Sequence, residues 1–140
     1  MVESATANEF AQADNITKIM WIMNNSKYDK LRTIQGCNTL WDLNATVTDV
    51  KIILKMAKAF GVKDENLYHD EEPDVASLKK TYMTIMKASR AMSAKEEPHI
   101  IMVYCGGHGA TQNEKQVYLL NCEKAQDAMF QLEFKLRYLV

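Results

Sequence analysis

The chain has 140 residues, 47% of them hydrophobic, which is enough for one domain with a substantial core and too little for a second. Its 17 Lys and Arg residues and 18 Asp and Glu residues give a net charge of −1, so no overall electrostatic field favours nucleic acid or an anionic membrane surface. No stretch approaches the roughly 18 apolar residues that a membrane span requires. From the charge and the apolar lengths together, we expect neither nucleic acid nor a membrane as a partner.

The three cysteines are odd in number and irregularly spaced, without a C-x-x-C pair. Such spacing favours neither a disulfide framework nor a structural zinc site. The N-terminal residues are polar and acidic, unlike a secretory signal, which begins basic and continues apolar. These features predict a soluble protein in a reducing compartment, cytoplasmic or otherwise intracellular.

Residues 1–15 show little periodicity and are predicted to form a flexible arm, followed by a single domain over residues 16–140. The apolar run over residues 18–23 is followed by Asn-Asn-Ser and predicts a buried strand entering a loop. Residues 24–46 have no regular repeat, so we expect a long loop above the sheet, a place where long ordered loops often serve function.

Two helices with a short strand between them are predicted next. Residues 47–60 carry apolar side chains at every third or fourth position, which predicts a helix with Gly61 as its C-terminal cap. A short strand over residues 66–69 is expected to follow. Asp74 is then placed to cap a second helix, whose apolar stripe runs through residues 75–89.

Residues 100–105 form an apolar run that leads directly to a glycine-flanked histidine, His108. A run without alternation predicts a central strand covered on both faces. In an open α/β sheet, ligands collect beyond the carboxyl ends of the strands, where this order of residues puts His108. A short strand over residues 117–120 is expected next. The chain is predicted to finish in a helix whose apolar stripe comprises Met129, Leu132, Leu136 and Leu139.

The order strand, helix, strand, helix, strand implies parallel strands joined by right-handed helical crossovers. The predicted fold is therefore α/β, with a mostly parallel, Rossmann-like sheet and helices on both faces. No nucleotide fingerprint accompanies it, because a phosphate-binding loop would need glycines after the first strand and residues 23–28 contain none. Dinucleotide-binding and P-loop functions are therefore disfavoured.

Several segments resemble one protein family in the same order along the chain. Residues 103–109, with the sequence VYCGGHG, are similar to the Y-Y-S-G-H-G segment of caspase-like cysteine proteases. Residues 43–50, followed by the predicted helix that ends in Phe-Gly-Val, resemble segments of metacaspases and paracaspases, and residues 117–120 and 132–137 resemble the family's next strand and helix. The resemblance covers roughly residues 17–140. It implies a caspase-like three-layer sandwich that is incomplete at its C-terminus.

In this family a histidine and a cysteine form a catalytic dyad, in which the thiolate attacks the scissile carbonyl and the imidazole protonates the departing amine. The resemblance assigns the acid-base role to His108 and a place in the oxyanion hole to the backbone N–H of Gly109. The alternatives are a structural histidine that closes a core strand and an ordinary turn glycine.

The nucleophile is the missing part of this resemblance. The caspase histidine precedes its cysteine by about 50 residues, whereas Val140 lies 32 residues after His108, so the expected cysteine falls beyond Val140. Cys105 lies within a predicted strand and is expected to be a small core residue. Cys122 precedes the last predicted helix, which the family's nucleophile follows, and Cys37 lies in the long loop. Whether the chain is an enzyme therefore stays open, and the alternative is a catalytically inactive caspase-like module that acts as a binding or structural subunit.

The resemblance also implies a substrate preference. Caspases that cleave after aspartate carry an arginine at the position of Leu43, so a pocket of that type is not expected here. Asp49 matches an aspartate with which metacaspases and paracaspases hold a basic side chain, and a complete form is expected to cleave polypeptides after Arg or Lys. The alternative is an ordinary aspartate in the first turn of a helix.

Other polar residues are weaker candidates. His69 closes a predicted strand and His99 precedes one, so both are expected to be solvated boundary residues. The acidic residues over 64–74 could attract calcium, a cofactor of some metacaspases, but they lack the D-x-D-x-D-G loop pattern, so no metal or other cofactor is predicted. Without a further strand beside them, residues 100–105 would form an apolar open edge, so we expect the chain either to aggregate or to be completed by additional polypeptide through strand addition.

Overall fold

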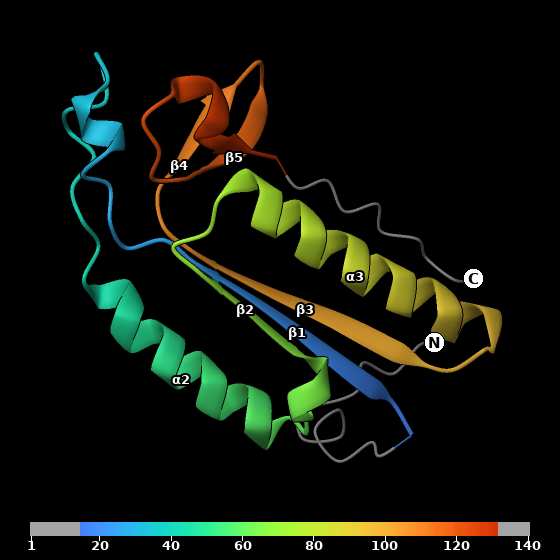
Figure 1. The fold of residues 1–140 in the computed structure, drawn as a ribbon. Helices are drawn as coiled ribbons and strands as arrows, with labels where there is room; N and C mark the ends of the chain where they lie inside the picture. The colour runs from blue at the N-terminus through green and yellow to red at the C-terminus, as the bar shows by residue number, and fades with distance from the viewer. Residues whose placement is uncertain (1–14, 132–140) are drawn as a thin grey trace.

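The computed structural model describes residues 15–131, which form two small sheets and two long helices (Figure 1). The first sheet contains β1 (Thr17–Asn24), β2 (Leu67–Glu71) and β3 (His99–Gly106), and the helices are α2 (Ala45–Ala59) and α3 (Val75–Ala94). The second sheet contains β4 (Gly109–Gln112), β5 (Lys115–Leu119) and β6 (Met129–Phe130), and single 3-10 turns cover Leu31–Thr33, Asp64–Asn66 and Ala125–Asp127. Residues 1–14 of the predicted arm and residues 132–140 of the predicted last helix lie outside the described residues.

The first sheet is parallel, with the strand order β2-β1-β3. Figure 1 shows α2 and α3 on opposite faces of it. The side chains of β1 alternate between the two faces, so that Ile22 packs in one core cluster with Val50 of α2 and Trp21 packs in another with Leu78 and Ile85 of α3. The α/β fold, the parallel strands and the helices on both faces are therefore confirmed.

The centre of the parallel sheet is β1, whereas we expected residues 100–105 to form the central strand. Within the described residues, β3 lies at an edge and pairs with β1 alone. Both of its faces are covered, because Ile101 and Val103 pack in the α3 cluster and Met102 and Tyr104 in the α2 cluster. An apolar run reports covered faces and does not report how many strands lie alongside. The central position was therefore wrong for the described residues, whereas the open edge expected of residues 100–105 in the absence of a further strand is what the structure has.

Local signals at the helix ends agree with the sequence. Gly61 has a φ of +85°, the left-handed conformation expected of a residue that follows a helix C-terminus. The Asp74 side chain accepts a hydrogen bond from the backbone N–H of Ser77 at 2.7 Å, so this residue caps α3 as predicted. No helix among the described residues is long and apolar enough to cross a membrane.

The second sheet is antiparallel and starts directly after His108. β4 and β5 form a hairpin whose two turn residues, Asn113 and Glu114, have φ angles of 50° and 63°, as a two-residue type I′ turn requires. β5 includes most of the predicted strand over residues 117–120, while β4 was not predicted. Met129 was predicted to be helical, but it pairs with Leu119 as part of β6, so its fit to the helical stripe was a coincidence of spacing.

Candidate functional site

The loops that follow β1 and β3 meet at the carboxyl end of the parallel sheet. β1 continues into α2 on one face, whereas β3 is reached through α3 on the other, so the direction of winding changes between these two neighbouring strands. Such a switch point is where open α/β sheets form their ligand crevice. The two strand ends are joined by a 2.8 Å hydrogen bond from the Asn25 N–H to the Gly106 carbonyl. His108 follows two residues later, beyond the carboxyl end of β3 as predicted, and the structure places that end at the switch point.

The imidazole of His108 is held by a backbone carbonyl from the long loop. Its Nε2 lies 2.8 Å from the carbonyl oxygen of Trp41, 67 positions earlier in the chain. Since a carbonyl oxygen can only accept, Nε2 must carry the proton. In the neutral ring the basic nitrogen is then Nδ1, for which no hydrogen-bond partner exists among residues 15–131. The ring is partly buried, and the hydrogen bond at Nε2 fixes its orientation.

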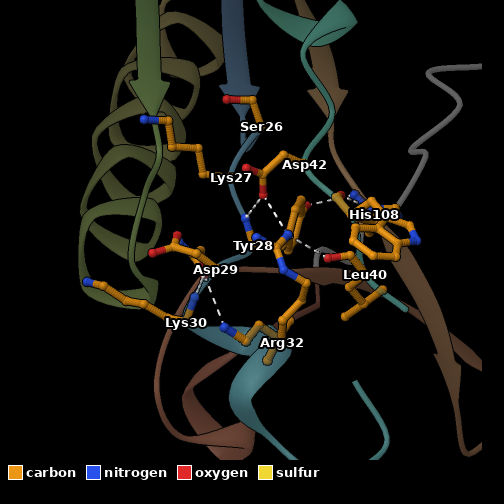
Figure 2. Close-up of polar contacts among 12 residues, drawn as sticks. Ser26, Lys27, Tyr28, Asp29, Lys30, Arg32, Leu40, Asp42 and His108 are labelled. Carbon is orange, nitrogen blue, oxygen red and sulfur yellow. Dashed lines mark hydrogen bonds and ion pairs between the residues drawn. The ribbon is translucent and has the colours of Figure 1, made fainter. Parts of the chain in front are cut away.

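Tyr28 lies beside the same histidine and supports it (Figure 2). Its side chain is fully buried, and its hydroxyl accepts a 2.7 Å hydrogen bond from the His108 N–H while donating one of 3.1 Å to the Leu119 carbonyl. The two rings meet edge to face with their centroids 4.6 Å apart. Burial raises the pKa of Tyr28, so the group remains a neutral hydroxyl that can serve as donor and acceptor together.

Gly107 lets the chain turn between β3 and His108. It has a φ of +150°, which side chains rarely permit, and a Cβ added there would lie 2.6 Å from the Tyr28 hydroxyl and 2.8 Å from Cε2 of Tyr118. The Tyr118 hydroxyl in turn donates a 2.6 Å hydrogen bond to the Gly106 carbonyl. The loop therefore passes through a gap between two tyrosines that only glycine fits.

Gly109 is exposed and opens β4 opposite Tyr118. The Leu119 N–H donates to the His108 carbonyl at 2.9 Å, which makes residues 108 and 119 a hydrogen-bonded pair of the ladder. Since bonded and non-bonded pairs alternate in antiparallel sheets, Gly109 and Tyr118 form a non-bonded pair. The Gly109 N–H thus points away from β5, an orientation that is compatible with donation to an oxyanion.

A hollow of about 310 Å³ opens beside the histidine. Its lining comes from the ends of β1 and β3, the histidine loop, β5 and β6, and comprises Met23, Cys105, Gly107, His108, Gly109, Gln116, Val117, Tyr118 and Phe130. Apolar side chains and two glycines therefore surround the histidine on this side.

Cys105 lines this hollow and is exposed, so the expectation that it is a small core residue is wrong. The reason is its place at the end of β3, on the edge of the sheet. Although the residue is exposed, partial desolvation of the sulfur raises the pKa of its thiol, which disfavours the thiolate. Among the described residues it makes no hydrogen bond with His108, and it does not have the features of an activated nucleophile.

The other two cysteines are no better placed. Desolvation raises the pKa of the Cys122 thiol, which donates a 3.0 Å hydrogen bond to the Lys124 carbonyl. Cys37 is partly buried in a cluster around Tyr28 and Leu31. The part of the chain that the structure describes therefore presents a histidine without a paired thiol.

Asp49 is exposed and lies in the second turn of α2, since that helix begins at Ala45. The alternative of an ordinary helical aspartate is therefore wrong only in the turn that it named, since Asp49 lies just beyond the first one. Asp49 is close enough to Tyr104 for its charge, after burial, to raise the pKa of that hydroxyl. Both lie on the α2 side of the sheet, and Asp49 is not part of the lining of the hollow beside His108. Leu43, at the position where aspartate-specific caspases carry an arginine, is an apolar residue that packs against the cluster around Tyr28, so it offers no cation to a substrate.

The two remaining histidines do not join this site. His69 is exposed on β2, in agreement with a solvated boundary residue. His99 was expected to be solvated as well, but both of its ring nitrogens have partners: Nδ1 lies 3.0 Å from the Glu97 carbonyl and Nε2 lies 2.7 Å from the Ser89 hydroxyl. Within residues 15–131, no three His, Cys, Asp or Glu side chains are grouped to hold a metal ion.

The sequence did not identify Tyr28, Trp41 or Asp42 as parts of the site. Trp41 acts through its backbone carbonyl, a group that every residue has, so no residue type could have signalled it. No family model, curated protein or solved structure matches this chain. Its chemistry is therefore inferred from the motif resemblance and from the geometry of the site.

Proposed function

We propose that this chain is the histidine-bearing part of a caspase-like cysteine endopeptidase domain. The observation that supports this best is the 2.8 Å hydrogen bond between Nε2 of His108 and the Trp41 carbonyl. It fixes the ring with Nδ1 as the base, which is what a histidine needs in order to take a proton from a thiol. A histidine with a purely structural role would be expected to use both nitrogens, as His99 does.

The proposed reaction uses His108 twice. A cysteine thiol transfers its proton to Nδ1, and the resulting thiolate forms a bond with the scissile carbonyl carbon. When the C–N bond breaks, the proton on Nδ1 passes to the departing amine, and water later hydrolyses the thioester. The Trp41 carbonyl stabilises the imidazolium in between, and the Gly109 N–H would donate to the oxyanion.

The cysteine has to come from additional polypeptide. Among the described residues β3 has one strand neighbour, so its other side offers backbone donors and acceptors for a further strand. A strand paired there would end beside Cys105 and the hollow at His108. Strand addition at β3 is thus the proposed route by which the nucleophile reaches the histidine.

The proposed substrates are polypeptides with Arg or Lys before the scissile bond. Asp49 supplies an exposed carboxylate on the α2 side of the sheet end, where it also acts on Tyr104. A carboxylate favours guanidinium or ammonium groups over an acidic side chain. Leu43 occupies the place where an aspartate-specific pocket would need a cation.

The test is a peptidase assay on a form that includes any residues encoded after Val140. We expect cleavage of peptides with Arg or Lys before the scissile bond, little cleavage after Asp, and loss of activity in His108→Ala. Asp49→Asn should lower the preference for basic residues, while Asp64→Asn, on the turn before β2, serves as a matched control. Hydrolysis that survives His108→Ala would reject the proposal.

A second candidate function is a non-catalytic module that binds a protein partner. It is favoured by the cysteines of the described part, two of which have raised thiol pKa values and none of which hydrogen-bonds with His108. This function predicts a stoichiometric partner in pull-down experiments and no hydrolysis by any natural form. Peptide cleavage that depends on His108 would exclude it.

A further inference from the structure

His108 is one member of a ring of hydrogen bonds, and the other members belong to the loop after β1 (Figure 2). Its backbone N–H binds the Tyr28 hydroxyl, the Tyr28 N–H binds a carboxylate oxygen of Asp42, and the carbonyl of the preceding Trp41 returns to Nε2 of the imidazole. We propose that Tyr28 and Asp42 are positioning residues that hold the His108 imidazole in its Nε2–H form, with Nδ1 directed to the reacting group. The catalytic meaning of this inference rests on the proposed function, whereas the arrangement itself can be tested without any hydrolysis.

Tyr28 fixes both the backbone and the ring of the histidine. The hydroxyl holds the His108 N–H at 2.7 Å, and the edge-to-face contact restricts the rotation of the imidazole. Because the side chain of Tyr28 is fully buried and its hydroxyl is also bonded to Leu119, it cannot follow a movement of the loop. One end of the histidine is thus anchored to the core.

Asp42 restrains the Trp41 carbonyl, which is the hydrogen-bond acceptor for Nε2 of the His108 ring. Its Oδ1 accepts hydrogen bonds from the Tyr28 N–H at 2.9 Å and from Nη1 of Arg32 at 2.7 Å. The same Nη1 also donates to the Leu40 carbonyl at 3.0 Å, so the residues on both sides of Trp41 are held by one guanidinium. The Trp41 carbonyl between them has little freedom to leave Nε2.

The indole of Trp41 does not provide this anchoring itself. Its side chain is 69% exposed, with the Arg32 guanidinium 5.9 Å from the ring centroid. The loop around it is held in two other ways: Leu43 packs against the cluster around Tyr28, and its N–H donates a 2.7 Å hydrogen bond to the Ser26 carbonyl. The hydrogen bonds of Asp42 add the restraint nearest to the Trp41 carbonyl. The carboxylate form that these bonds require is favoured because they lower the pKa of Asp42.

The experiment is ¹⁵N NMR of the histidine rings in the 140-residue chain, at a pH of about 8, above the ordinary titration range of imidazole. The ring nitrogen shifts give the tautomer, and the exchange of the ring proton with water gives its protection. His99 is an internal reference of the opposite type, because its Nδ1 must donate to the Glu97 carbonyl. Asp29→Ala is the matched control for Asp42→Ala, since Asp29 lies on the same loop and binds Asn121 instead.

We expect the wild-type chain and Asp29→Ala to show His108 as a protected Nε2–H tautomer. In Tyr28→Phe and Asp42→Ala the exchange of this proton should accelerate about tenfold, the factor that one net hydrogen bond is worth, with a mixed tautomer signal. The His99 signals should not change. Asp42 is at the surface, so its replacement does not endanger folding even if Tyr28→Phe does.

Unchanged protection of the His108 proton in folded Asp42→Ala would overturn the inference, and so would a wild-type signal of the Nδ1–H type. Absence of peptidase activity in a longer form would count against the proposed function and would leave these spectra as they are. The two failures are therefore distinguishable.

Discussion

The two ends of β3 each carry a histidine, and the two are held in different ways. His99, at the start of the strand, uses both ring nitrogens on partners that lie two and ten residues away in the sequence. His108, beyond the end of the strand, uses one nitrogen on a carbonyl 67 positions away and its backbone on a tyrosine 80 positions away. Local bonds occupy both ring nitrogens of His99, whereas the bonds from distant loops leave Nδ1 of His108 without a partner among residues 15–131.

The largest effect that distinguishes the two ends is on catalysis. In a complete, active form, His108→Ala should lower kcat by about 10²–10⁴-fold, because acid-base catalysis by a positioned imidazole is lost. His99→Ala should leave kcat nearly unchanged and should cost about 1–2 kcal/mol of unfolding free energy, because the Ser89 hydroxyl and the Glu97 carbonyl lose their partners. Peptide hydrolysis and urea denaturation measure the two effects, and equal losses of activity in both variants would refute the contrast.

A second difference is how well the two glycines beside His108 tolerate an added side chain. Gly107→Ala should destabilise the chain by about 3 kcal/mol, because the new Cβ meets Tyr28 and Tyr118 and the φ of +150° is strained. Gly109→Ala is the matched control, since its Cβ would meet the Val117 carbonyl at an ordinary 3.4 Å. We expect a change below about 1 kcal/mol there. Urea unfolding curves that place both variants together would contradict this account of the loop.

A third difference concerns the cap of α3, at the same edge of the sheet as His108. Asp74→Ala should cost about 1 kcal/mol, because it removes the acceptor for the Ser77 N–H and half of the capping box. The His108 ring signals should not change in this variant, since the cap is a local structure. A loss of the protected His108 proton in Asp74→Ala would show that the two regions are coupled.

The smallest expected effect is the dependence of stability on pH through Asp42. Hydrogen bonds from Arg32 and from the Tyr28 N–H lower the pKa of this carboxyl in the folded chain. Its contribution to stability is therefore fully present above the unfolded value of about 3.9 and is lost as the pH falls through the lower folded value. The difference in stability between the wild type and Asp42→Ala should accordingly disappear below that range. A difference that grows as the pH is lowered would reverse this sign.

The parallel sheet was accessible to sequence reasoning because burial leaves a periodic trace. The apolar runs at β1 and β3, the helical stripe of α2, Gly61 and Asp74 each reflect local rules. Strand position within the sheet leaves no such trace, which is why β3 was wrongly placed in the centre and Cys105 wrongly placed in the core.

The candidate site could be predicted only in part. His108 was recognisable because glycines on both sides of a histidine after an apolar run are unusual, and Gly109 followed from the same motif. The Trp41 carbonyl could not be predicted, since its role depends on where a long loop folds back. The final stripe failed at Met129 because helical spacing over few residues also fits a strand of two residues.

The chain has two tryptophans, and they report on different parts of the molecule. Trp21 is 1% exposed in the core, with its Nε1 bound to Asp70 at 2.8 Å, whereas Trp41 is 69% exposed and contacts His108 through its backbone carbonyl. A soluble quencher of fluorescence such as acrylamide therefore reaches Trp41 in the native chain and Trp21 only after the sheet opens. Without any added label, emission from Trp41 reports on the loop that holds the histidine, and emission from Trp21 reports on the loss of the core.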